Sequence, residues 1–204
     1  MDADSGTRHL VSALERIFVM KRLFATLIAV IFAAPLFAAT LGDDGLHKTD
    51  WMRETFKDLG EDLAEANAEG KRLMIIIEQR GCIYCKKMHE EVFVVPEIDQ
   101  YIHDNYFVVQ INMFGDLEVT DFDGTTLPEK DMVRHWNALF TPTILFFPTE
   151  VDAEASADQA AVAIMPGAFG RHTTFNMLNW VVEQGYLGDE SFQKYHARKF
   201  AVQQ

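Results

Sequence analysis

Cysteine is scarce in this sequence, which holds only Cys82 and Cys85 among 204 residues. An exported protein that relies on disulfides for stability usually carries several, distributed over its loops. A bond between cysteines three residues apart closes a very short loop, so it restricts the unfolded chain little. The pair therefore predicts chemistry rather than a structural staple.

Basic residues are also few, with 18 Lys and Arg against 31 Asp and Glu and a net charge of −13. Residues 1–40 contain four of the basic and three of the acidic residues, so 14 basic and 28 acidic residues remain after them. Binding to phosphate backbones needs a basic face. A nucleic-acid partner is therefore excluded, and the acidic surface is read as a source of solubility.

Long apolar runs are missing except near the N-terminus. There, Met20-Lys21-Arg22 precedes the stretch LFATLIAVIFAAPLFAAT. A basic start, an apolar run and small residues after it are typical of a secretory signal peptide. We predict translation from Met20, an upstream extension plus cleaved signal over residues 1–39, a single domain over 40–204, and a periplasmic location. A retained membrane anchor is the alternative, although the run is at the short limit for spanning.

Hydrophobic periodicity predicts alternating helices and strands after the signal. The apolar run Leu73–Ile77 is read as a buried strand, followed by a turn and a helix that begins near the cysteines and breaks at Pro96. Together with a second strand this forms a βαβ unit, which should pair in parallel, and the last two strands should form an antiparallel hairpin. The expected helices cover residues 49–69, 86–105, 126–136, 173–184 and 189–200, and the expected strands cover 73–77, 106–112, 143–147 and 161–165.

The cysteine pair sits where the predicted strand and turn lead into a helix. Free N–H groups at a helix N-terminus stabilise a thiolate, and Lys86 and Lys87 add positive potential. Such surroundings lower the pKa of a thiol, and the thiolate is the reactive form. We predict that Cys82 is the nucleophile and that the more buried Cys85 resolves the mixed disulfide.

The strand, the Cys-x-x-Cys helix and a later Thr-Pro-Thr before a strand together resemble the thioredoxin superfamily. The resemblance implies an α/β, thioredoxin-like fold with a mixed sheet of about four strands, and a cis Pro142 that faces the cysteines. Thr141, Pro142, Gly81 and Tyr84 would then contact the substrate. The stretches EQRGCIYCKKMH, VVQINMFGDLEVTDFDG and FTPTILFFP are similar to exported thioredoxins of bacterial sulfur-oxidation (Sox) systems.

That narrower resemblance implies a reductase of periplasmic protein disulfides. A sulfur-carrier protein is one candidate partner, and a membrane thiol-electron transporter is the expected reductant. The chain is expected to act as a monomer with no cofactor beyond the Cys82–Cys85 disulfide. Two alternatives remain: a disulfide isomerase or oxidase on the same fold, and a redox-responsive or zinc-binding module that is not an enzyme.

Two features depart from the family pattern. Gly81 stands where thioredoxins carry Trp, and Ile83-Tyr84 replaces Gly-Pro between the cysteines. The predicted strand before the cysteines is wholly apolar, so the buried acid of thioredoxins has no obvious counterpart. Glu78 is the nearest carboxylate, and it is either the proton acceptor for Cys85 or a solvated turn residue.

Cys82, Cys85 and His89 could together bind zinc, because His89 can share a helix face with Cys85. A structural zinc site needs four ligands, and no second Cys/His cluster follows in the sequence. We therefore predict no metal, and we expect His89 to be a partly exposed helix residue. The acidic loop that holds Asp116, Glu118, Asp121 and Asp123 is read as solvated.

Overall fold

A computed structural model describes residues 39–202, which fall within one compact unit of the chain. The predicted extension, signal peptide and start at Met20 lie outside the described residues. Within residues 39–202, no helix has the length and apolar character needed to cross a membrane.

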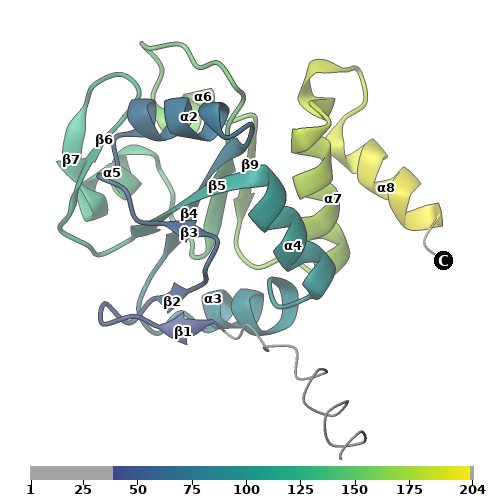
Figure 1. Cartoon of the computed structure of the whole chain (residues 1–204), viewed down its shortest axis with the longest axis horizontal. Coiled ribbons are helices and arrows are strands. Elements are labelled where there is room, and N and C mark those ends of the chain that lie inside the picture. The colour runs from purple at the N-terminus through teal and green to yellow at the C-terminus, as the bar shows by residue number, and fades with distance from the viewer. Residues whose placement is uncertain (1–38, 203–204) are drawn as a thin grey trace, which may run out of the picture. The chain divides into compact units, whose positions relative to one another are not determined.

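Within the described residues, short strands precede the first helix, and helices and strands then alternate (Figure 1). The strands are β1 Thr40–Leu41, β2 His47–Lys48, β3 Met52–Arg53, β4 Arg72–Glu78, β5 Tyr106–Asn112, β6 Glu118–Thr120, β7 Thr126–Pro128, β8 Thr143–Phe146 and β9 Ala163–Pro166. The helices are α2 Leu59–Ala68, α3 Ile83–Lys87, the π-helix η1 Met88–Val92, α4 Pro96–Asn105, α5 Glu129–His135, α6 Ala157–Ala160, α7 Arg171–Val182, the 3-10 helix η2 Gly185–Leu187 and α8 Phe192–Val202.

A five-stranded mixed sheet in the order β3-β5-β4-β8-β9 forms the centre of the fold. β4 and β5 pair in parallel from Arg72↔Tyr106 to Glu78↔Asn112, as the βαβ pattern predicts. β8 and β9 form the expected antiparallel pair. The thioredoxin-like α/β class is thus confirmed, and the sheet has five strands because β3 adds to the edge of β5.

Alternation along β4 divides the core into two layers. Met74 and Ile76 face a cluster built with α4, α7, α8 and the α3–η1 segment, whereas Ile75 and Ile77 face a cluster built with α2, α5 and α6. Figure 1 shows the two groups of helices on opposite faces of the sheet. Glu78 continues the series of Met74 and Ile76, so it enters the layer beneath the cysteine helix.

Several boundaries differ from those expected. The predicted helix over 49–69 is wrong in its first half, since β3 comes first and α2 begins after its N-cap Asp58. The predicted start of a helix at Thr126 is also wrong, because Thr126 lies in β7 and α5 starts after Pro128. Strand pairing with β5 and β6 decides these positions, and pairing across the fold is not visible in local periodicity.

Candidate functional site

The two cysteines form a disulfide at the start of α3. Gly81, immediately before them, has φ +72°, a backbone conformation that glycine adopts without the cost other residues meet. Cys82 is the N-cap of α3, and its Sγ accepts a hydrogen bond from the backbone N–H of Cys85 at 3.0 Å. Cys82 is 7% exposed and Cys85 is 1% exposed, so Cys82 is the sulfur within reach of a partner.

The Thr141–Pro142 peptide bond is cis, as the resemblance to thioredoxins implies. Thr141 lies against the disulfide, and its hydroxyl donates a hydrogen bond to Cys82 Sγ at 3.3 Å. The resemblance implies that Thr141 contacts the substrate, and the structure adds a contact from its side chain to Cys82. Cys82 Sγ thus accepts from two donors, and donors directed at a sulfur favour its thiolate form after reduction.

Exposed apolar side chains flank Cys82 and Thr141 in the sequence. Ile83 and Tyr84 are 72% and 58% exposed, and Phe140, which precedes Thr141, is 63% exposed. A hollow of about 300 Å³ lies beside them, and Tyr84, Phe140, Thr141 and residues 166–168 line it. An apolar surface of this kind around a reactive sulfur suits an extended peptide segment.

Glu78 is the last residue of β4 and is 1% exposed, so the solvated-turn reading is wrong. Its Oε1 lies 3.0 Å from His89 Nε2, and its Oε2 accepts a hydrogen bond from Gln110 Nε2 at 2.6 Å. Gln110 in turn accepts from Lys48 Nζ at 2.6 Å. A buried carboxylate is costly unless hydrogen-bonded, and this network supplies its partners.

His89 is fully buried in η1, so the expectation of partial exposure is wrong. Its ring stacks on His47 from β2, with centroids 4.8 Å apart. Burial, and then the charge of His89, lower the pKa of His47 below its ordinary value of 6.5. The helix spacing from Cys85 indicated His89, but nothing local indicated His47, which arrives from a separate hairpin.

The structure therefore gathers Cys82, Cys85, Gly81, Tyr84, Thr141 and Pro142 at one end of the sheet, with Glu78 in the layer beneath. Within residues 39–202 there is no cluster of three or more His, Cys, Asp or Glu side chains arranged to hold a metal ion.

Comparisons with known proteins agree with this geometry. A family model described as a thioredoxin-like domain matches residues 59–153. The thiol:disulfide interchange protein DsbD of Colwellia psychrerythraea is 32% identical over 89 residues, which is 44% of this chain and 13% of that protein. DsbD of Citrobacter koseri is 28% identical over 126 residues, which is 60% of this chain and 20% of that protein. The chain thus spans a fifth or less of the length of these two relatives.

Among solved structures, a thioredoxin-fold protein from Helicobacter pylori superposes with a TM-score of 0.50 and 16% identity, covering 65% of this chain and 86% of that one. This likeness supports the fold alone. The fold, the paired cysteines and the matched segment agree: residues 59–153 match a thioredoxin-like domain, and the chain is similar in part to thiol:disulfide interchange proteins.

Proposed function

We propose that this protein is an exported reductase that acts as a monomer and transfers electrons from Cys82 and Cys85 to disulfides of periplasmic partner proteins. The observation that carries the proposal is the environment of Cys82 Sγ. It accepts hydrogen bonds from Cys85 N and Thr141 Oγ1, and it lies at a surface of exposed apolar side chains. A sulfur held in this way is stabilised as a thiolate, which is the attacking form in disulfide exchange.

The reaction proceeds through two exchanges. The Cys82 thiolate attacks one sulfur of the substrate disulfide, and the other substrate sulfur leaves as a thiolate. The Cys85 thiolate then attacks Cys82 Sγ, which releases the second substrate sulfur and forms the Cys82–Cys85 disulfide. The pair loses two electrons and the substrate disulfide gains them.

Glu78 is proposed as the group that accepts the Cys85 proton, with His89 orienting its carboxylate at 3.0 Å. A general base of this kind contributes about 100-fold or more to a rate. Glu78→Gln is expected to slow the second exchange in single-turnover reduction and to leave the first exchange unchanged. An unchanged rate of the second exchange would contradict this role.

We propose that the partners of this protein are other proteins that exchange disulfides with it. The relatives carry the name thiol:disulfide interchange protein, which favours exchange with other proteins. A sulfur-carrier protein of a Sox-type system is the proposed substrate, and a membrane thiol-electron transporter is the proposed reductant.

Reduction of insulin disulfides tests the activity. The wild-type protein is expected to turn over with dithiothreitol as reductant, and Cys82→Ser is expected to abolish turnover. Activity that survives in Cys82→Ser would dismiss Cys82 as the nucleophile. The reduction potential of the pair tests the direction, because reductases lie near about −270 mV and strong oxidants near about −120 mV.

A trap for the physiological partner uses Cys85→Ser, which stalls at the mixed disulfide. We expect covalent capture of a few exported, cysteine-bearing proteins, identified by mass spectrometry. The matched control is Cys82→Ser, in which Cys85 is buried and should capture none. Equal yields from the two variants would contradict the assigned roles.

A further inference from the structure

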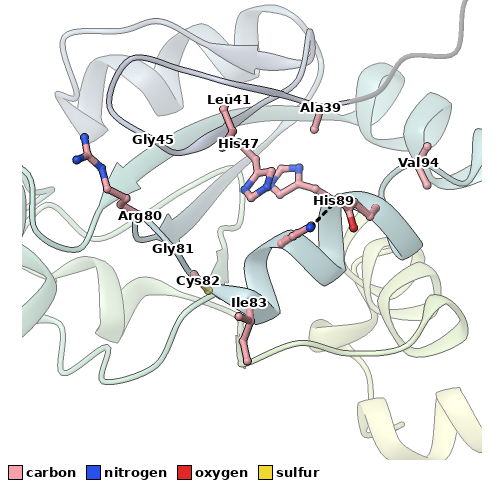
Figure 2. Close-up of a pocket in the computed structure, with 12 residues that line it drawn as sticks. Ala39, Leu41, Gly45, His47, Arg80, Gly81, Cys82, Ile83, His89 and Val94 are labelled. Atoms are coloured by element: carbon pink, nitrogen blue, oxygen red, sulfur yellow. Dashed lines mark ion pairs between the residues drawn. The ribbon is translucent and has the colours of Figure 1, made fainter.

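A second and larger hollow lies on another side of the cysteine loop. It encloses about 730 Å³, within the range of small-molecule sites. Cys82 and Ile83 line it, together with His47 from β2 and His89 from η1. Figure 2 shows the stacked imidazoles between the hairpin and the cysteine helix, with Cys82 where that helix begins. The hollow does not share its lining with the 300 Å³ hollow beside Thr141.

The residues that line this hollow are more basic than the chain as a whole. The protein carries a net charge of −13, yet Arg80 and Lys86 contribute two cations here and Glu90 is the one carboxylate. Lys86 Nζ lies 3.6 Å from a Glu90 oxygen, and both side chains are more than half exposed. An exposed pair at this distance is weak, so an anionic group on a ligand can displace Glu90.

Two histidines, His47 and His89, are among the residues that line the hollow. His89 Nδ1 is buried and has no hydrogen-bond partner among the described residues. A buried, unpartnered ring nitrogen is uncommon and costs free energy. The remaining walls are apolar, from side chains that include Leu41 and Val94. Apolar walls with a few polar groups and cations at the opening suit a small organic molecule that carries a negative charge.

We propose that this hollow binds a low-molecular-weight organic disulfide bearing a negatively charged group and presents its sulfur to Cys82. The inference rests on the proposed exchange function and adds a second substrate class to it. Cys82 thiolate attacks the small disulfide, forming a mixed disulfide and releasing one small thiolate. Cys85 thiolate then attacks Cys82 Sγ and releases the second. Two electrons pass from the cysteine pair to the small disulfide, which becomes two thiols.

The test compares two small disulfides on the reduced protein by stopped flow. One is 5,5′-dithiobis(2-nitrobenzoate), which carries two carboxylates, and the other is bis(2-hydroxyethyl) disulfide, which is neutral. The readout is the ratio of their second-order rate constants. A change in the thiolate fraction of Cys82 alters both rates by the same factor, so the change in this ratio from one variant to another is independent of that fraction.

Lys86→Gln is compared with Lys87→Gln, since the neighbouring lysine has the same charge but does not line the hollow. We expect Lys86→Gln to lower the anionic-to-neutral ratio about fivefold and Lys87→Gln to leave it within about twofold. Glu90→Gln, which frees Lys86, should raise the ratio about twofold. Equal ratios in Lys86→Gln and Lys87→Gln would overturn the site.

Insulin reduction separates this inference from the function on which it rests. If the wild-type protein reduces insulin but the anionic-to-neutral rate ratio is the same in Lys86→Gln and Lys87→Gln, the small-molecule site is wrong and the exchange function stands. If the wild-type protein reduces neither insulin nor the small disulfides, the exchange function itself fails.

Discussion

Asp62 is a buried acid in the first turn of α2, and its surroundings make a prediction about pH. Burial raises its pKa from 3.8 to about 6, with Asp58 and Glu65 adding to the rise and a hydrogen bond from Thr55 opposing it. The folded state therefore binds a proton that the unfolded chain has released between pH 4 and pH 6. The stability that protonated Asp62 contributes to the folded state is fully present below about pH 4, and it is lost as the pH rises through about 6.

Above about pH 6 the folded protein must bury an ionised Asp62 carboxylate, and Asp62→Asn removes this free-energy cost. At pH 8 we expect the free energy of unfolding to rise by about 1–2 kcal/mol, with a smaller gain at pH 5. Urea unfolding followed by circular dichroism at both pH values measures the difference. The exposed neighbour Glu61→Gln is the control and should show neither change. Equal gains for Asp62→Asn at pH 5 and pH 8 would show that the carboxyl does not titrate in this window.

Glu78 and His89 show how far single residues could be placed from sequence. The cysteine pair, Gly81 and the cis Pro142 were indicated by local patterns and by resemblance. Glu78 was assigned to a turn because the apolar run ends at Ile77, yet alternation through Met74 and Ile76 directs the next even position into the same layer. Its partners Gln110 and His89 come from β5 and η1, and such tertiary pairing leaves no local signal.

At the scale of elements, one buried ion pair connects the segment before α2 to the start of α5. Lys57 Nζ lies 2.6 Å from Glu129 Oε1 and also donates to the carbonyl of Gln110 in β5. Glu129 Oε1 further accepts from the N–H of Asn112. The glutamate side chain is 3% exposed, so removing the lysine leaves an uncompensated charge in the interior.

We expect Lys57→Met to lower the free energy of unfolding by about 3 kcal/mol. The double variant Lys57→Met with Glu129→Gln should lose less, because glutamine removes the charge and keeps an acceptor for Asn112. A double-mutant cycle by urea unfolding measures the coupling. Lys130→Met, from an exposed pair with Asp116, is the control and should be indistinguishable from wild type. A double variant that is less stable than Lys57→Met would refute the argument.

Elements with strong periodicity were predictable, and short ones were not. The run Leu73–Ile77 and the segment Tyr106–Asn112 are strands within a residue of their expected bounds. By contrast, the acidic loop after β5 contains the β6–β7 hairpin. Its Asp121 is buried, where it accepts hydrogen bonds from Trp136 and from the N–H of Ala157. A carboxylate buried by contacts with distant elements has the same local sequence as a solvated one.

At the scale of the whole molecule, both redox states are expected to be folded. The disulfide joins residues three apart, and closing so short a loop stabilises by about 2 kcal/mol or less in the chain-entropy view. Urea unfolding with and without dithiothreitol should therefore give two cooperative transitions that differ by no more than this amount. The variant with Cys82→Ser and Cys85→Ser should resemble the reduced protein. Loss of cooperative unfolding on reduction would assign the bond a structural role.

The difference in exposure between the two sulfurs has a practical result for labelling. A thiol alkylating reagent added to the reduced protein reaches the 7% exposed Cys82 well before the 1% exposed Cys85. One adduct forms, and the inner thiol is then left without the neighbour it needs for oxidation. A molecule that is alkylated only at Cys82 can neither accept nor donate an electron pair. The fraction of molecules that gain the mass of one adduct in a mass spectrum therefore measures the active fraction directly.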